Sequence, residues 1–381
     1  MRYSGSSGCR AVVIAVDEPD PDNLALVVYV CLKIRALSQE GIEVAGILLT
    51  GRPVGPPHDE KGRPIPGRHN EAESRRIQEY GAQRFYAHLQ RAGITGVQIY
   101  DGGIAFETPI PDHIHFKSED FHDGPERGTG GPLLPLKTLV QNIGRNEIDW
   151  IVGGPMTGVA LALHSDPQLA EQTRSLHAMY GAMEGADLMS GEQFNFMVDR
   201  DAGKYVLSEL NRRGKKIVLV PTNTTKDPEL ALDEQRIQYM FGYGTEGGVL
   251  ADINHKWHKN VLVPAKQEYF SHDLAAGMAY IENEIGGTSI FALVPGRCMF
   301  EAKEGKVRMT LEQTGPGGEG EGPIRFRIGG GRRGRNRGLA GSPAERRRVS
   351  SRSTKNVCAN ELILLFQCQA DEVAVAGVHA G

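Results

Sequence analysis

The sequence predicts an α/β fold in which a mostly parallel central sheet is flanked by helices. Two observations indicate this fold. Apolar runs such as 12–16 (VVIAV) and 216–220 (KIVLV) lack polar alternation, which is typical of strands buried on both faces. These runs alternate along the chain with segments of helical pattern such as 24–37 and 200–212. Such alternation favours crossover connections between parallel strands.

The remaining elements follow in the same order. Short apolar runs predict strands at 42–49 (IEVAGILL), 97–100, 149–152 (DWIV) and 176–180, and Gly153, Gly154 and Pro155 end the strand at 149–152. Helices are predicted at 69–92, 136–143, 159–163 and 274–281. The stretches 50–68 and 102–135 are longer than ordinary connections, so we expect surface excursions or lids there.

Composition divides the chain into three parts. We expect one domain over residues 1–310, a disordered segment over 311–356 and a tail over 357–381. Gly, Arg and Ser dominate 315–353, and such a segment buries too little apolar area to offset the entropy of ordering it. This basic segment is either a solvated tail or an arm that contacts RNA, an anionic surface or a protein. The apolar run 362–366 (LILLF) is either an extra strand or a buried piece of the tail.

Composition also limits the class of protein. The 381 residues are 40% hydrophobic and carry a net charge of -4, which supports a hydrophobic core and argues against a nucleic-acid-binding body. The five cysteines form no CxxC or Cys/His cluster, which argues against structural zinc and a disulfide framework. No signal-peptide pattern appears, and no apolar run approaches the roughly 20 residues of a membrane helix. We therefore expect a soluble, cytoplasmic protein.

The strand at 12–16 runs directly into an acidic segment. Residues 17–23 (DEPDPDN) contain four carboxylates and one amide, at Asp17, Glu18, Asp20, Asp22 and Asn23. Open α/β sheets bind ligands at the carboxyl ends of their strands. Carboxylates this close repel one another unless a cation or bound protons neutralise them, and a hard metal ion is the simplest such cation. A solvated turn with surface acids is the alternative.

Four segments, in order, resemble the motifs of one family. They are 17–26 (DEPDPDNLAL), 153–171 (GGPMTGVALALHSDPQLAE), 191–207 (GEQFNFMVDRDAGKYVL) and 270–280 (FSHDLAAGMAY). They resemble the DxDPGxDDxxAL, GPLTNxALAL…DP, AEFNxxxDPEAA and xHDPLA motifs of the inosine–uridine-type nucleoside hydrolases, over roughly residues 11–307. The chain is identified as a divergent member of that family. The resemblance implies a Rossmann-like nucleoside hydrolase fold.

The resemblance also implies an activity and the residues that carry it. The expected reaction is metal-dependent hydrolysis of the N-glycosidic bond of a ribonucleoside or related N-riboside, giving base and ribose, with Ca²⁺ as the ion. The matching metal ligands are Glu18, Asn23, the backbone carbonyl of Thr157, and Asp273. The matching catalytic residues are Glu18 as general base and His272 as the group that protonates the leaving base. The matching substrate-binding residues are Asp22, Asp187, Gln193 and Asn195. The resemblance also allows a homo-oligomer.

The expected chemistry is coherent. A bound Ca²⁺ lowers the pKa of its water, and a carboxylate takes the proton. Nearby anionic groups stabilise the oxocarbenium-like state of the ribosyl group.

Departures from the family pattern keep other functions open. Glu18 replaces an Asp, Asn23 replaces an Asp and Gln193 replaces a Glu. An amide oxygen ligates calcium without charge, so Asn23 predicts weaker ion binding. These substitutions favour altered substrate, altered metal or lost activity. The second hypothesis is therefore a catalytically impaired protein that binds a ribosyl ligand or regulates a partner. A Mg²⁺-dependent phosphohydrolase is weaker, because the acidic segment lacks a DxDx[TV] arrangement.

Three site residues also have purely structural interpretations. Thr157 fits the first turn of a helix, and His272 with Asp273 fits an N-cap pair before the helix at 274–281. Asn195 lies between two Phe residues, and if it is buried it needs hydrogen-bond partners, which either a ribose or the backbone can supply.

Overall fold

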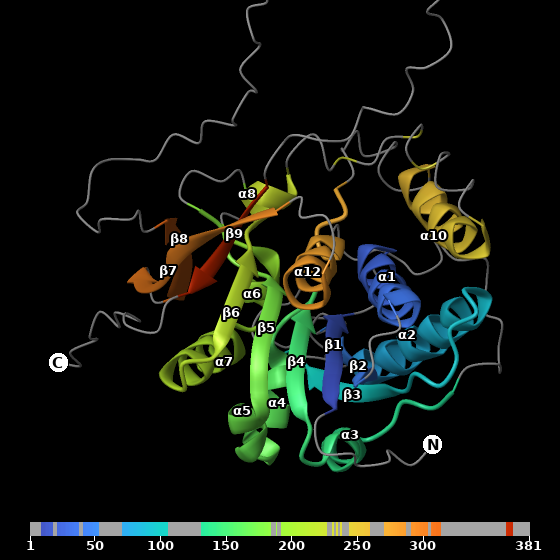
Figure 1. Cartoon of the computed structure of the whole chain (residues 1–381), viewed down its shortest axis with the longest axis horizontal. Helices are drawn as coiled ribbons and strands as arrows, with labels where there is room; N and C mark the ends of the chain where they lie inside the picture. The colour runs from blue at the N-terminus through green and yellow to red at the C-terminus, as the bar shows by residue number, and fades with distance from the viewer. Residues whose placement is uncertain are drawn as a thin grey trace, which may run out of the picture.

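A nine-stranded sheet with helices on both faces forms the body of the protein (Figure 1). The computed structural model describes residues 9–17, 21–37, 41–52, 71–105, 131–183, 192–226, 244–259, 270–286, 291–303, 306–313 and 363–368, together with Leu188, Ala231, Glu234 and Ile237.

The strands are β1 (Arg10–Asp17), β2 (Ile42–Gly51), β3 (Ile99–Ile104), β4 (Glu147–Val152), β5 (Thr173–Met179), β6 (Lys216–Val220), β7 (Phe291–Lys303), β8 (Lys306–Gln313) and β9 (Ile363–Cys368). The helices are α1 (Pro21–Leu37), α2 (Glu71–Arg91), α3 (Leu136–Ile143), α4 (Thr157–Ser165), α5 (Gln168–Gln172), α6 (Phe194–Val198), α7 (Arg200–Arg212), α8 (Thr222–Thr225), α10 (Gly244–Trp257) and α12 (Leu274–Tyr280), which continues into the π-helical turn η5 (Ile281–Ile285).

The strands lie in the order β3-β2-β1-β4-β5-β6-β9-β7-β8. The first six in this order pair in parallel, which confirms the predicted fold class. Strand β9 is antiparallel to β6, and β7 pairs in parallel with β9 and antiparallel with β8. The strand order reverses between β1 and β4, and sheets of this kind bind ligands outside the carboxyl ends of the strands at that position.

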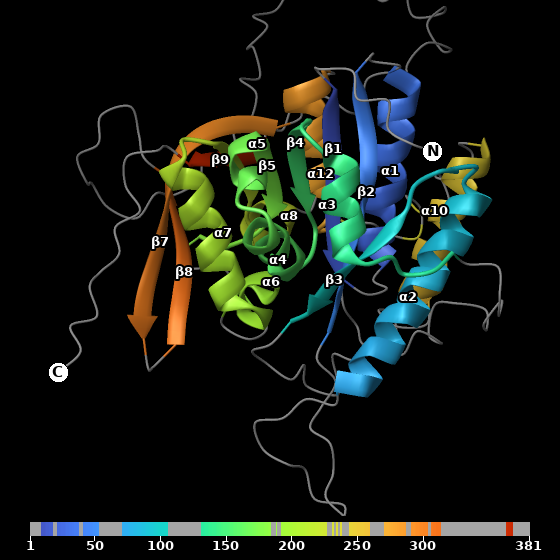
Figure 2. The same cartoon turned by 90° about the horizontal axis from the view of Figure 1, so that it is seen from below.

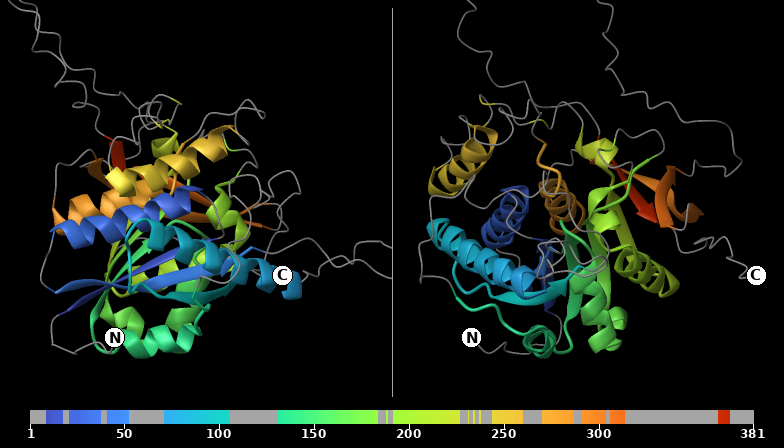
Figure 3. Two further views of the ribbon diagram at one scale, coloured as in Figure 1. Left: turned by 90° about the vertical axis from the view of Figure 1, so that its right-hand side faces the viewer. Right: turned by 180° about the vertical axis from the view of Figure 1, so that it is seen from behind.

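Alternate residues of β1 face two separate hydrophobic cores. Val13 and Ala15 pack with residues of α3, α4, α5 and α7 on one face of the sheet. Val12, Ile14 and Val16 pack with residues of α1, α2 and α12 on the other face. The two helical layers are visible from below and from the side (Figures 2 and 3). Burial on both faces explains why this strand has no polar alternation.

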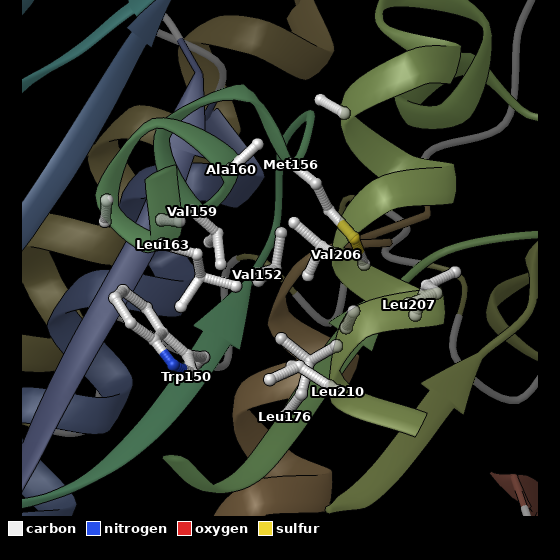
Figure 4. Close-up of a cluster of buried hydrophobic side chains, with 14 of the residues drawn as sticks. Trp150, Val152, Met156, Val159, Ala160, Leu163, Leu176, Val206, Leu207 and Leu210 are labelled. Atoms are coloured by element: carbon white, nitrogen blue, oxygen red, sulfur yellow. The ribbon is translucent and has the colours of Figure 1, made fainter. Parts of the chain in front are cut away.

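The core between the sheet and helices α4 and α7 is closely packed (Figure 4). Trp150 on β4 is fully buried there and lies in one cluster with Leu163 of α4 and Leu210 of α7. Its indole Nε1 donates a hydrogen bond to Thr173 Oγ1 at 2.9 Å, so its one polar atom is satisfied. This core fixes the turn between β4 and α4 relative to the rest of the sheet.

Helix α12 lies unusually close to α1. A Cβ atom at Gly277 of α12 would lie 2.5 Å from Leu26 Cδ1 and 2.9 Å from Val30 Cγ2 of α1, which is closer than real side chains pack. Glycine at 277 is therefore needed for the two helices to approach. This packing places the start of α12 next to the start of α1.

Several elements were not predicted from the sequence. Strands β7 and β8 and helix α10 were missed. The run 362–366 overlaps β9, so of its two interpretations the structure has the extra strand. Strand β8 extends past the expected boundary at 310, and β9 lies within the expected tail. The threefold division of the chain otherwise stays a prediction, since the Gly/Arg-rich segment and most of 50–68 and 102–135 lie outside the described residues.

Within the described part of the chain, none of the helices combines the length and apolar character needed to cross a bilayer.

A buried charge cluster lies near the amino ends of the strands, away from the expected ligand edge. Asp149 accepts hydrogen bonds from Arg10 at 2.6 Å, Ser175 at 2.6 Å and Arg174 at 3.0 Å. Burial alone would raise the pKa of Asp149, but these hydrogen bonds outweigh burial and hold the pKa below its ordinary value. The cluster therefore contributes stability at neutral pH.

His177 of β5 lies beside this cluster and makes stability depend on pH. Its Nε2 is 3.6 Å from Glu284 Oε1, and Asp149, Arg174 and Lys216 also act on it electrostatically. Among the described residues, neither ring nitrogen has a hydrogen-bond partner. Burial, the largest effect, lowers the pKa of His177 from 6.5 to about 4. The folded protein thus binds fewer protons than the unfolded chain between these values, and stability falls as pH falls through them.

We predict that His177→Phe flattens this dependence. Phe keeps an aromatic ring at position 177 but cannot titrate. In urea unfolding from pH 7 to pH 4, the wild-type free energy of unfolding should fall more steeply than that of the variant, by up to about 1.4 kcal/mol per pH unit. Parallel curves for the two proteins would contradict the assignment.

Candidate functional site

The carboxyl end of β1 is held by two nitrogen donors. Asp17, the last residue of β1, is 1% exposed. Its Oδ1 accepts a hydrogen bond from Asn23 Nδ2 at 2.6 Å, and its Oδ2 forms an ion pair with Arg52 Nε at 2.8 Å. Arg52 directly follows β2, which pairs with β1. The sequence analysis expected an external cation to neutralise the acids of residues 17–23. For Asp17, the Arg52 guanidinium supplies a positive charge from within the chain.

The first turn of α1 meets the start of α12. The carboxylate of Asp22 is buried, and its Oδ2 accepts the backbone N–H of Asp273 at 3.2 Å. These two residues are 251 positions apart in the sequence. Asp273 takes the N-cap position of α12, but its side chain makes no capping hydrogen bond. Capping through the side chain therefore does not explain why an Asp is present there.

The turn after β4 passes close to both acidic elements. A Cβ atom at Gly153 would lie 2.8 Å from Asn23 Oδ1 and 3.0 Å from Asp273 Cβ, so only glycine fits. Asn23 is fully buried, and within the described residues its Oδ1 has no hydrogen-bond partner. The structure thus brings Asn23 and Asp273 next to Gly153 and Asp22 next to Asp273, while their roles toward a ligand stay predictions.

Asn195 and Gln193 are bonded within the protein. Asn195 Nδ2 donates to the carbonyl oxygens of Gly153 at 2.6 Å and Met179 at 3.2 Å. Gln193 Oε1 accepts the backbone N–H of Phe196 at 2.9 Å and so caps α6. For Asn195, the backbone is the partner that the structure shows, and its role toward a ribose stays a prediction.

Thr157 begins α4 and contacts a buried acid. Its Oγ1 donates to Asp199 Oδ2 at 2.6 Å, while Asp199 Oδ1 accepts the Ala202 N–H at 3.1 Å and caps α7. Burial raises the pKa of Asp199, and the hydrogen bonds from Thr157 and Ala202 oppose that rise only in part. Thr157 therefore lies in the first turn of α4, as its structural interpretation expects, and its side chain bonds Asp199. The role of its backbone carbonyl as a metal ligand stays a prediction.

His272 lies beside Asp273 and contacts α8. Its Nδ1 is 2.5 Å from Thr225 Oγ1. Burial, assisted by the charge of Lys226, lowers the pKa of His272 from 6.5 to about 4. The ring is therefore neutral at pH 7 in this structure, and a role as proton donor requires the bound substrate to raise that pKa.

Two of the predicted site residues, Glu18 and Asp187, lie outside the described residues. The sequence analysis gave no role to three residues that contact the site, Arg52, Asp199 and Thr225, and it named Asp17 only as one of the acids of residues 17–23. Asp17 and Arg52 each lie at the carboxyl end of a predicted strand, and Asp199 matches the Asp of the third motif. Those signals could have identified them, whereas no sequence signal indicated Thr225.

The oxygen atoms near Gly153 are suitable ligands for a hard cation. Carboxylate and amide oxygens are the ligands that Ca²⁺ prefers, and the buried Asn23 Oδ1 is an acceptor that a cation would satisfy. Over the residues that the structure describes, no three His, Cys, Asp or Glu side chains gather in a metal-binding arrangement. Asp22 and Asp273 supply two charges and Asn23 none, and the weaker ion binding expected from the sequence stays a prediction.

Comparison with known proteins assigns the family. The sequence profile of the inosine-uridine preferring nucleoside hydrolases matches residues 82–338, more than half of the chain. The chain belongs to this nucleoside hydrolase family. Three of the four sequence motifs lie within the match, while the acidic segment lies before it. An uncharacterized protein of Schizosaccharomyces pombe is 26% identical to this chain over 44% of the chain and 62% of the relative, so the chain covers less than two thirds of that protein.

Solved nucleoside hydrolases share the fold. A plant nucleoside hydrolase has a TM-score of 0.54 at 15% identity, with 79% of this chain and 86% of that chain covered. A purine-preferring ribonucleoside hydrolase from Gardnerella vaginalis has a TM-score of 0.52 at 16% identity, with 79% and 88% covered. At these identities the likeness shows the fold alone, and it confirms the fold expected from the sequence.

We predict that Asn195→Ala destabilises the protein by about 1–3 kcal/mol, because it leaves two buried carbonyl oxygens without their donor. Urea unfolding at pH 7 measures the change. Asn142→Ala is the control, since Asn142 donates to Tyr100 at 3.0 Å from a less buried position, and it should cost less. Equal stability of Asn195→Ala and wild type would show that these hydrogen bonds do not hold the site together.

Proposed function

We propose that the protein hydrolyses the N-glycosidic bond of a ribonucleoside or related N-riboside, giving base and ribose. The observation that carries this proposal is the hydrogen bond between Asp273 N–H and the Asp22 carboxylate. It brings the acidic segment and the His-Asp pair to one place at the carboxyl ends of β1 and β4, where sheets of this topology bind ligands. Membership of the family supports the reaction class.

We propose the following roles for the residues of the site. Asp22 accepts hydrogen bonds from the ribose hydroxyls, and its charge together with that of Asp273 stabilises the oxocarbenium-like transition state. Glu18 is proposed as the general base that takes a proton from the attacking water. His272 is proposed to protonate the leaving base once substrate binding raises its pKa.

The proposed ion is Ca²⁺. Asn23 Oδ1 and Asp273 would hold it, with Glu18 and the Thr157 carbonyl as the further ligands expected from the family motifs. When bound, Ca²⁺ would supply a water of lowered pKa for attack on the anomeric carbon.

Asp187, Gln193 and Asn195 are the other proposed ribose-binding positions. Because Gln193 Oε1 already caps α6, its Nε2 is the group left to contact a sugar, and it lies 3.3 Å from Met179 Sδ. We also propose a cytoplasmic location and allow for a homo-oligomer. The partner of the basic segment stays open.

A second candidate function has a specific observation in its favour. Asn23 donates a hydrogen bond to Asp17, and Arg52 forms an ion pair with it. The charge of Asp17 is therefore compensated without a metal. The same arrangement is expected in a protein that still binds a ribosyl ligand but no longer hydrolyses it. Base release distinguishes it from the hydrolase, since ligand-dependent thermal stabilisation without product indicates binding alone.

We predict base release from at least one member of a panel of purine and pyrimidine ribonucleosides when the full chain is assayed with Ca²⁺. EDTA should abolish the release, and excess Ca²⁺ should restore it. Asp22→Asn should lower kcat/KM by about 10²-fold or more, because it removes a charge that acts on the transition state. Asp201→Asn, on the exposed side of α7, is the matched control and should leave the rate unchanged.

Folded, Ca²⁺-loaded protein that releases no base from any nucleoside would overturn the hydrolase proposal. In that case, a rise in Tm with nucleoside or ribose would support the binding protein instead. A Tm unaffected by every ligand would overturn both candidate functions.

A further inference from the structure

Arg52 is a cation built into the acidic site. Its side chain is 15% exposed, and its Nε is 2.8 Å from Oδ2 of Asp17, whose side chain is 2% exposed. Its guanidinium carbon lies 5.4 Å from the ring centroid of Phe194, within the range of a cation–π contact. Arg52 thus joins the ends of β1 and β2 to α6, the helix that carries Asn195.

We propose that Arg52 is the counter-ion of the acidic segment, a positioning residue that neutralises Asp17 and weakens divalent-ion binding at the neighbouring Asn23 and Asp273. The inference rests on the proposed function for the location of the ion site. The Arg52 guanidinium would then supply part of the positive charge that the sequence analysis expected from an external cation.

The first step of the argument is the orientation of Asn23. Because its Nδ2 donates to Asp17 Oδ1, its Oδ1 is turned toward Gly153, 2.8 Å from where a Cβ of that residue would be. Asp17 holds this orientation while its carboxylate stays in place. A buried carboxylate without a cation is costly, and Arg52 removes that cost. Asn23 is held by its own hydrogen bond to Asp17, so Arg52 acts on the proposed ion position through its charge.

The second step concerns charge. Asp17, Asp22 and Asp273 are three buried carboxylates of neighbouring elements, and Arg52 brings one positive charge to the first of them, Asp17. A nearby positive charge opposes a divalent cation, and the effect is strong where water is scarce. Replacing a carboxylate by Asn23 acts in the same direction. Both features make the fold of this segment less dependent on a bound ion.

The test is the Tm of the full chain in EDTA and across a Ca²⁺ titration, without substrate, for wild type, Arg52→Lys and Arg52→Gln. Arg75→Gln is the matched control, because Arg75 pairs with Asp101 of the neighbouring strand β3 through a more exposed contact of 2.6 Å. The apparent Kd for Ca²⁺ follows from the dependence of Tm on its concentration.

We expect Arg52→Gln to lower Tm in EDTA and to bind Ca²⁺ with an apparent Kd roughly tenfold or more below that of wild type. Arg52→Lys keeps the charge and should keep the wild-type response to Ca²⁺, although it loses the planar contact with Phe194. Arg75→Gln should also respond as wild type does.

An unchanged Kd in Arg52→Gln, or the same gain in Arg52→Lys, would overturn the proposal, because the effect would then not follow the charge. If Arg52→Gln does not fold, Asn23→Asp decides: a second carboxylate beside Asp17 should also tighten Ca²⁺ binding, and no change would overturn the proposal. The Tm responds to ion binding and not to turnover. Absence of nucleoside hydrolysis therefore counts against the proposed function and leaves this test valid.

Discussion

The site depends on the contact between the starts of α1 and α12. The Asp22 carboxylate and the Asp273 N–H meet because the two helices pack closely, with Gly277 of α12 against Leu26 of α1. Without that approach, the acidic segment after β1 would have no second element opposite it. The glycine turn after β4 completes the arrangement, since any side chain at Gly153 would separate Asn23 from Asp273.

The treatment of charge distinguishes this chain from the pattern of its family. Where the family motif has a second Asp, Asn23 donates a hydrogen bond to Asp17, and Arg52 supplies the positive charge from the neighbouring strand. Asp17 is thus fixed by hydrogen-bond geometry as well as by charge, while Asn23 Oδ1 is turned toward Gly153, where we propose the ion to bind. Such a site suits weak or conditional ion binding better than an ion that is needed for folding.

Much of the fold could be predicted from the sequence, because β1 and β6 are buried on both faces and show it as apolar runs, and β4 ends in such a run. Strands β7 and β8 could not be predicted, since Arg297, Glu301 and Arg308 interrupt their apolar pattern. Within the site, the convergence of Asp22 and Asp273 followed from the motifs. The role of Arg52 did not, because it depends on the register between β1 and β2, which no local pattern encodes.

A crystal structure of the full chain grown with Ca²⁺ and ribose tests the central claim most directly. The account predicts a cation in contact with Asn23 Oδ1 and the Asp273 carboxylate, and ribose hydroxyls on Asp22, with the Asp22–Asp273 contact intact. An acidic segment directed into solvent, with Asp22 separated from Asp273 and both ligands bound elsewhere, would contradict it.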